Sequence, residues 1–150
     1  MGKETIMNAL KTGFSLSDRL EADTFPIVDL RLCTVRLMND TRYPWVILVP
    51  RVAHIEEMFE LSRVEQSFLM EEMSAVTRAV QAVTNPTKMN VGALGNIVRQ
   101  LHIHVIARFE TDATWPAPVW GQGEATPYND EGAAFLSLLR PQIAQEMDRK

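Results

Sequence analysis

The sequence has few of the residues that stabilise or anchor a protein outside the cytoplasm. It contains one cysteine, Cys33, among 150 residues, so no internal disulfide can form, and this favours a reducing compartment. The segment "MGKETIMNALKTG" lacks the continuous apolar stretch of a signal peptide. No run approaches the roughly 20 apolar residues of a membrane span. We therefore expect a cytoplasmic protein with no membrane partner, in which Cys33 is a buried apolar side chain.

An excess of positive charge is also missing. The chain has 15 Lys and Arg against 19 Asp and Glu, a net charge of −4. Because nucleic-acid binding depends on neutralising backbone phosphates, this balance indicates that nucleic acid is not a partner. The length and an apolar fraction of 46% suit one domain with its own core. We expect a single domain over residues 1–150.

Four segments have the composition of β-strands. They are apolar or alternating and rich in β-branched residues, and they span residues 28–38, 45–49, 87–94 and 97–109. The first two are separated by "NDTRYP", whose Asn, Asp and Pro are typical of a turn, so they are expected to form an antiparallel hairpin.

One long helix is predicted between the second and third strands. It begins at Ser62, which forms an S-x-x-E capping box with Glu65. Apolar residues then recur every three or four positions at Leu69, Met73, Val76, Val80 and Val83. Glu71 and Glu72 fall outside this stripe and are expected to be solvated. Shorter helices are expected over residues 3–12 and 130–147, so the fold class is α+β and mainly antiparallel.

Two of the three histidines lie in "VRQLHIHVIARFE", residues 98–110. Side chains alternate between the two faces of a strand. A strand here therefore places Gln100, His102 and His104 on one face. The apolar residues between them face the other way and are expected to pack on the long helix.

Spacing alone leaves three interpretations of this His-x-His pair open. The two imidazoles can be exposed surface side chains on a half-solvated sheet. They can be two ligands of a metal, with His54, Glu110 or Asp112 as a third. They can also include a nucleophile that attacks phosphorus, with neighbouring donors that stabilise the phosphoryl oxygens.

The wider pattern resembles the histidine-triad (HIT) superfamily, whose motif is His-φ-His-φ-His-φ-φ, where φ is apolar. "QLHIHVIAR" resembles that motif, and "NDTRYPWVILVPRVAHI" resembles the family's nucleotide-side hairpin and the turn after it. "NVGALGNIVR" resembles the Asn-containing, Gly-containing segment before the triad. The resemblance covers roughly residues 24–120 and leaves 130–147 as a C-terminal helical extension.

The resemblance implies a five-stranded antiparallel sheet with two main helices, usually paired as a homodimer. It implies hydrolysis or transfer at the α-phosphate of a nucleotide through a nucleotidyl-histidine intermediate. By position, His102 matches the nucleophile and His104 the third histidine beside the scissile phosphate. The positions that match substrate contacts are Asn96 for phosphate, Asn90 near the site, and Asn39 or Asp40 for the ribose.

Three positions depart from the family pattern. Gln100 occupies the first triad position, and its amide can hydrogen-bond but cannot carry a proton near neutral pH. Trp45 stands where many members have an additional histidine and is expected to line the nucleotide pocket or pack in the core. Ile97 replaces the usual Ser or Thr that donates to phosphate.

The sequence thus predicts a nucleotide hydrolase or transferase, with His102, His104 and Gln100 as the triad residues. The substrate is expected to be a purine nucleotide or dinucleotide, such as a dinucleoside polyphosphate or a nucleoside phosphoramidate, with no cofactor and no metal. Retention of the central histidine favours retained chemistry. Two alternatives stay open, a nucleotide-binding sensor with a decayed triad and, third, a metalloenzyme. Arg51, Arg99 and Arg108 are expected to be solvated or interface charges, with phosphate contact as the alternative.

Overall fold

Five strands form one antiparallel sheet in the computed structural model, which describes residues 13–149. The order across the sheet is β1-β2-β3-β5-β4. The strands are β1 (Thr24–Asp29), β2 (Cys33–Met38), β3 (Trp45–Pro50), β4 (Lys88–Gly92) and β5 (Ile103–Arg108). The helices are α2 (Asp18–Asp23), α3 (Arg63–Thr84), α4 (Glu131–Met147) and the short 3-10 helix η1 (Met58–Glu60). The expected fold class is confirmed, whereas the helix expected over residues 3–12 lies outside the described residues.

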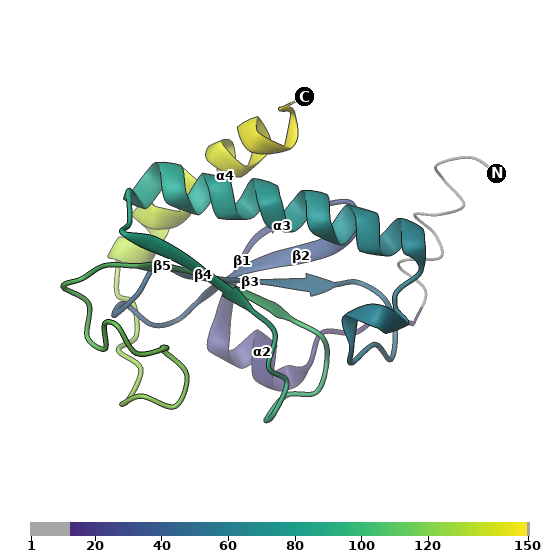
Figure 1. Cartoon of the computed structure of the whole chain (residues 1–150), viewed down its shortest axis with the longest axis horizontal. Helices are drawn as coiled ribbons and strands as arrows, with labels where there is room; N and C mark the ends of the chain where they lie inside the picture. The colour runs from purple at the N-terminus through teal and green to yellow at the C-terminus, as the bar shows by residue number, and fades with distance from the viewer. Residues whose placement is uncertain (1–12, 150) are drawn as a thin grey trace.

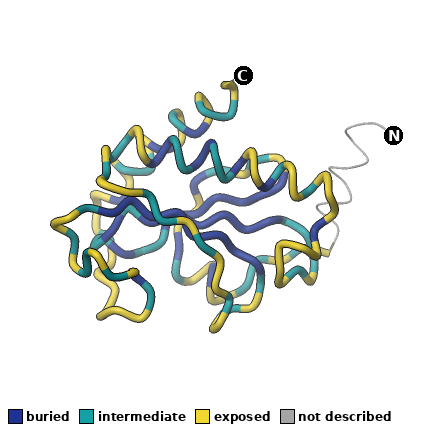
Figure 2. The backbone as a smooth tube through the Cα atoms, viewed as in Figure 1, coloured by how far each residue is buried: buried dark blue, intermediate teal, exposed yellow. Residues whose placement is uncertain are grey.

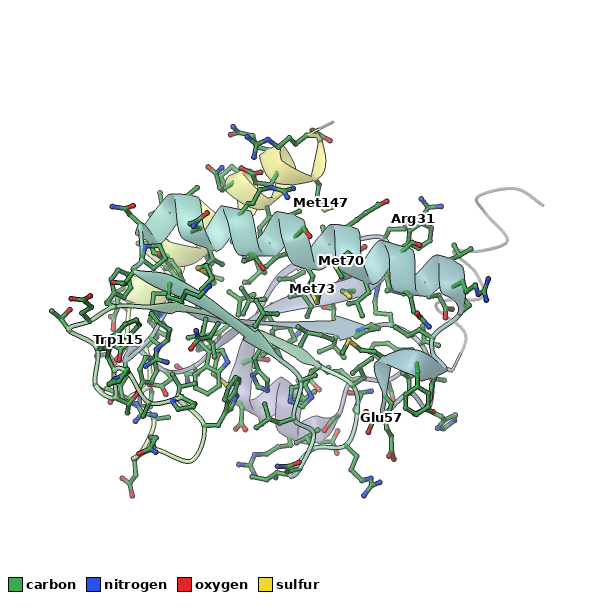
Figure 3. All side chains as sticks on the ribbon, in the orientation of Figure 1. Arg31, Glu57, Met70, Met73, Trp115 and Met147 are labelled. Carbon is green, nitrogen blue, oxygen red and sulfur yellow. The ribbon has the colours of Figure 1, made fainter. Side chains whose placement is uncertain are left out.

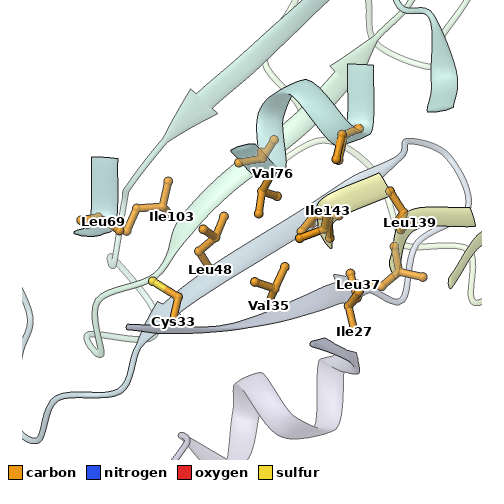
Figure 4. Close-up of a cluster of buried hydrophobic side chains, with 14 of the residues drawn as sticks. Ile27, Cys33, Val35, Leu37, Leu48, Leu69, Val76, Ile103, Leu139 and Ile143 are labelled. Carbon is orange, nitrogen blue, oxygen red and sulfur yellow. The ribbon is translucent and has the colours of Figure 1, made fainter. Parts of the chain in front are cut away.

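The helices cover the two faces of the sheet unequally. α3 and α4 lie over one face, and α2 lies on the other side (Figure 1). The larger core cluster fills the space between the sheet and the α3–α4 layer, with Leu48 and Ile103 from the sheet packed near Val76 of α3 and Ile143 of α4 (Figure 4). The inner strands are buried along their length, while the connecting loops are exposed (Figure 2). Because α4 contributes to this same core, it is an integral layer of the fold.

The N-terminus of α3 forms the capping box that the sequence predicts. The backbone N–H of Glu65 donates to the Ser62 hydroxyl at 3.1 Å, and the Ser62 N–H donates to the Glu65 carboxylate at 2.6 Å. Two otherwise unpaired helix donors are thereby satisfied. At the other end Asn85 adopts a left-handed conformation with φ of 49° and ends the helix.

The single strand expected over residues 28–38 is wrong, because β1 and β2 are separate strands joined by a tight turn. Glu72 of α3 explains the break. Its carboxylate accepts the backbone N–H groups of Leu32 at 2.7 Å and Cys33 at 2.9 Å. Glu72 is 1% exposed, so the expectation that it lies on a solvated face is also wrong. The turn depends on a side chain 40 positions away, which local patterning does not reveal.

The long strand expected over residues 97–109 is shorter in the structure, where β5 begins at Ile103. The preceding segment is a loop, and the backbone N–H of Leu101 donates to the Ile55 carbonyl at 2.9 Å. β5 then pairs with β3 on one side and β4 on the other. This central position buries every residue of β5 and fixes the place of the histidines at its start.

Candidate active site

His102 and His104 lie together at the beginning of β5, on the sheet face opposite α3. Their ring centroids are 4.8 Å apart, and the rings meet edge to face. His102 is 7% exposed and His104 is 5% exposed, so the interpretation as freely solvated surface histidines is wrong. Ile103 between them packs in the core beneath α3, as the strand alternation predicts.

The Nδ1 atom of His102 is 2.7 Å from the backbone carbonyl oxygen of Gln100. A carbonyl oxygen can only accept a hydrogen bond, so Nδ1 of His102 carries the proton. In the neutral ring, Nε2 then holds the free lone pair. Nε2 has no hydrogen-bond partner among the residues that the structure describes, and His102 lines a cavity. This is the arrangement that a nucleophilic imidazole needs.

His104 has the opposite proton arrangement. The indole Nε1–H of Trp45 donates to Nδ1 of His104 at 3.0 Å. An indole nitrogen only donates, so Nδ1 of His104 is unprotonated and Nε2 carries the hydrogen of the neutral ring. Burial, with a smaller contribution from the neighbouring His102, lowers the pKa of His104 to about 3. His104 therefore stays neutral at physiological pH and acts as an N–H donor.

A cavity of about 520 Å³ opens next to the two imidazoles. Its walls come from α2, from Met38 at the end of β2, from the loop before β5 and from the segment after Val119. The described lining residues are Arg19, Leu20, Asp23, Met38, Trp45, Leu94, Gly95, Asn96, Ile97, Val98, His102, His104, Trp120 and Gly121. The cavity combines apolar walls with a few polar groups near the histidines, which is typical of small-molecule sites.

Comparisons with known proteins agree with this geometry. The family model of the HIT domain matches residues 19–111, more than half of the chain. The chain belongs to the HIT family. A histidine triad protein from Sinorhizobium meliloti is 49% identical to this HIT protein, with a TM-score of 0.84 over 91% of this chain and 98% of the other. One from Bradyrhizobium japonicum is 45% identical, with a TM-score of 0.86 over 87% and 98%.

A third solved structure extends the same result. The histidine triad protein from Marinobacter aquaeolei is 47% identical, with a TM-score of 0.85 over 88% of this chain and 97% of that one. A comparison with curated proteins found no match. The family of this HIT protein is therefore established.

Gln100, which the resemblance matches to the first triad position, does not share a face with the histidines. It precedes β5, and its side-chain oxygen accepts the backbone N–H of Ser17 at 2.8 Å. Its side-chain nitrogen donates to the Ser15 carbonyl at 2.8 Å. The expectation that all three triad positions line one strand face is therefore wrong at Gln100, because the strand begins only at Ile103.

Asn39 and Asp40 also lie outside the cavity lining. The Asn39 side chain accepts the backbone N–H of Tyr128 at 2.8 Å. Asp40 is 1% exposed and pairs with Arg42 at 2.8 Å, and it accepts the N–H of Thr126 at 3.3 Å. Burial alone would raise the pKa of Asp40, but the hydrogen bonds and charge of Arg42 lower it. Both side chains hold the segment that leads to α4.

Asn90 belongs to a buried network around Arg108. Arg108 is 1% exposed, pairs with Asp112 at 2.8 Å and donates to Asn90 at 2.9 Å and to the Ala117 carbonyl at 2.8 Å. Arg108 also lies 5.7 Å from the ring of Trp115, in the loop after β5 (Figure 3). The expectation that Arg108 is a solvated or interface charge, with phosphate contact as the alternative, is therefore wrong. Its guanidinium organises the loop that brings Trp120 to the cavity.

Of the residues singled out from sequence, the structure brings His102, His104, Asn96 and Trp45 to one cavity. Ile97 also lines it and is 82% exposed. Sequence reasoning missed α2 as a cavity wall. The segment "SDRLEAD", in which Ser17 precedes a short acidic first turn, was the available signal.

The site holds no metal-binding constellation in the part of the chain that the structure describes, since no group of three His, Cys, Asp or Glu side chains there could hold an ion. His54 lies in an exposed turn with φ of 59°. Residues 13–149 also contain no helix long and apolar enough to cross a membrane.

Proposed function

We propose that this HIT protein is a nucleotide hydrolase or transferase that acts at an α-phosphate through a nucleotidyl-histidine intermediate on His102. The observation that carries the proposal is the opposite proton arrangement of the two imidazoles. The Gln100 carbonyl leaves the Nε2 lone pair of His102 free, and Trp45 leaves an N–H on Nε2 of His104. A nucleophile and a fixed hydrogen-bond donor thus lie side by side.

The reaction follows from these roles. Nε2 of His102 attacks phosphorus, a P–N bond forms, and the bond to the leaving group breaks. The ring of His102 then carries a positive charge, which the Gln100 carbonyl stabilises through Nδ1–H. The Nε2–H of His104 donates to a phosphoryl oxygen as negative charge develops there. Water, or another acceptor, attacks phosphorus in the second step and releases His102.

The cavity suits a purine nucleoside monophosphate unit. Its volume of about 520 Å³ falls within the range of small-molecule sites. Leu20 and Met38 supply apolar surface for a base, and Asn96 lies in the loop beside His102 as a donor to phosphate. The resemblance implies ribose contact by Asn39 or Asp40, but both side chains are bonded elsewhere, whereas Asp23 of α2 lines the cavity. Asp23 is therefore our candidate for ribose contact.

Trapping the intermediate tests this proposal. The purified protein is mixed with a dinucleoside polyphosphate, quenched in alkaline denaturant because P–N bonds are acid-labile, and measured by intact mass. A mass increase of one nucleoside monophosphate is expected for wild type and absent for His102→Gln. His54→Asn is the matched control because it removes the exposed histidine outside the cavity, and it should form the adduct normally.

Binding without an adduct would support the alternative. If the protein binds the nucleotide but neither an adduct nor product forms over hours, the hydrolase proposal is wrong and a nucleotide-binding sensor is the better interpretation. If His102→Gln turns over as fast as wild type, the nucleophile lies elsewhere.

We also propose that the protein forms a homodimer in the cytoplasm. β4 pairs only with β5 in the described sheet, so its other edge is open. Open edges with apolar side chains are surfaces that proteins cover. Val91 of β4 is 45% exposed. A second copy that pairs with β4 would cover both the open edge and this apolar side chain.

A further inference from the structure

Trp45 of β3 lines the cavity, and its indole Nε1–H donates a hydrogen bond to Nδ1 of His104. We propose that Trp45 is a positioning residue that fixes His104 as a non-titrating N–H donor and so restricts the site to leaving groups that depart as anions. This inference rests on the proposed function, because it concerns the leaving group of the same reaction. The substrate class it names is phosphoric anhydrides, with phosphoramidates excluded.

Three neighbouring side chains surround the His104 ring and influence its protonation. The Trp45 Nε1–H donates to Nδ1 at 3.0 Å, and protonation of Nδ1 would break this bond and set two N–H groups against each other. The ring of Trp120 meets His104 edge to face, with centroids 5.4 Å apart, which encloses the ring in aromatic surface. His102 lies on the remaining side, with centroids 4.8 Å apart. The Trp45 hydrogen bond opposes protonation of Nδ1 directly, whereas Trp120 acts only by burying the ring, a role that another aromatic side chain can fill.

The described residues around the cavity offer no replacement acid close to the leaving group. The lining contains two titratable side chains besides the histidines, Arg19 and Asp23, both on α2. They pair with each other at 2.7 Å, and the Asp23 hydrogen bond raises the pKa of Arg19 still further. Gln100 carries an amide and is bonded to residues 15 and 17. Met38 and Trp120 have no proton to give at neutral pH.

The bond changes then decide which substrates react. When His102 attacks, the electron pair of the breaking bond goes to the leaving atom, and no proton accompanies it. An anhydride oxygen accepts that pair easily, because the leaving phosphate or polyphosphate is stable as an anion. The nitrogen of a phosphoramidate would leave as an amide anion unless it were protonated in the transition state. Water supplies the hydroxyl in the second step and releases its proton to solvent.

The size of the effect follows from what a general acid contributes. Proton transfer by a positioned side chain accelerates a reaction by about 10²- to 10⁴-fold. Wild type should therefore form the adduct from an adenosine dinucleoside polyphosphate at least about 10²-fold faster than from an adenosine phosphoramidate. Both substrates deliver the same adenylyl group, so the ratio of the two rates isolates the leaving group.

The experiment combines single-turnover adduct formation with the protonation state of His104. Long-range ¹H–¹⁵N NMR of the imidazoles should report an unprotonated Nδ1 and a protonated Nε2 for His104 between pH 5 and 8. Trp45→Phe keeps an aromatic ring but removes the N–H, which opens Nδ1 to protonation. In this variant the Nδ1 resonance of His104 should shift toward the protonated value. The ratio of the adduct-forming rate with the polyphosphate to that with the phosphoramidate should fall by about tenfold.

Trp120→Phe is the matched control, because Trp120 also meets the His104 ring, while its Nε1–H has no partner among the described residues. It should leave the His104 tautomer and the substrate ratio unchanged, whatever its effect on the two individual rates. If the ratio of the two adduct-forming rates falls equally in Trp45→Phe and Trp120→Phe, Trp45 is not the residue that positions His104.

The remaining outcomes separate the two proposals. Wild-type adduct formation at similar rates from both substrates would overturn the leaving-group inference and leave the proposed function standing. A protonated Nδ1 on His104 in wild type would overturn it as well, and that measurement needs no variant to fold. If no adduct forms from the dinucleoside polyphosphate or from the phosphoramidate, the proposed function itself is overturned.

Discussion

The side chain of Gln100 accepts a hydrogen bond from the backbone N–H of Ser17 at 2.8 Å, across 83 positions of sequence. Its nitrogen donates to the Ser15 carbonyl at the same distance. Gln100 therefore clamps the segment that leads into α2, and α2 forms a wall of the cavity. Its side chain thus supports the cavity beside His102 and His104.

Replacing Gln100 tests this role. Gln100→Ala removes both hydrogen bonds, which should lower the free energy of unfolding by about 1–3 kcal/mol. It should also loosen α2, so KM should rise more than kcat falls. Gln100→His restores the family pattern in sequence but points away from the cavity, so we expect no gain in turnover. Denaturant melts and steady-state kinetics check both variants, and faster turnover by Gln100→His would contradict the clamp.

The pKa of His104 predicts how stability depends on pH. It is lowered from an ordinary 6.5 to about 3, so between these values the unfolded chain binds a proton that the folded protein does not. The contribution of His104 to the free energy of unfolding is therefore fully present above about pH 6.5, and it falls as the pH drops towards 3. The loss amounts to up to about 5 kcal/mol across the interval.

Denaturant unfolding from pH 4 to 7 measures this slope. His104→Asn should be less stable than wild type at pH 7 and should have a shallower dependence on pH. The comparison with the variant is needed because burial raises the pKa of Glu72, which acts with the opposite sign. An equally steep slope in His104→Asn would show that another group carries the effect.

Asn90→Ala separates a structural from a catalytic role at a position that sequence reasoning placed near the site. Asn90 accepts from Arg108 at 2.9 Å, and a buried charge that loses a partner is costly. We expect a loss of about 1–3 kcal/mol in unfolding free energy. The adduct-forming rate of the folded variant should stay within about threefold of wild type. If that rate falls by about 10²-fold without a loss of stability, Asn90 takes part in the reaction rather than in the fold.

The open edge of β4 predicts the oligomeric state. Light scattering should report twice the 17.0 kDa mass of the chain. Val91→Lys places a charge on the exposed apolar part of β4, which opposes pairing between edges, so it should shift the protein to monomer. The folded spectrum should be unchanged, because Val91 is 45% exposed. A wild-type monomer at all concentrations tested would reject the homodimer.

Sequence patterns predicted well those elements whose stabilising contacts are local. The capping box at Ser62 involves residues three positions apart, and the apolar stripe of α3 repeats within one element. The break between β1 and β2 was missed because Glu72 and the turn it caps are far apart in the chain. The start of β5 was misplaced for the same reason, since the loop before it is held by contacts with residues 15–17 and 55.

The sequence by itself determined the family pattern, the alternation that places His102 and His104 on one side of the chain at the start of β5, and the absence of a titratable side chain at position 100. These follow from residue identity and the two-residue period of a strand. Only the tertiary structure decided which nitrogen of each imidazole carries the proton. That assignment depends on a carbonyl at Gln100 and on an indole of β3, 59 positions from His104. A hydrogen bond joins groups that are close in space, and only folding brings Trp45 and His104 together.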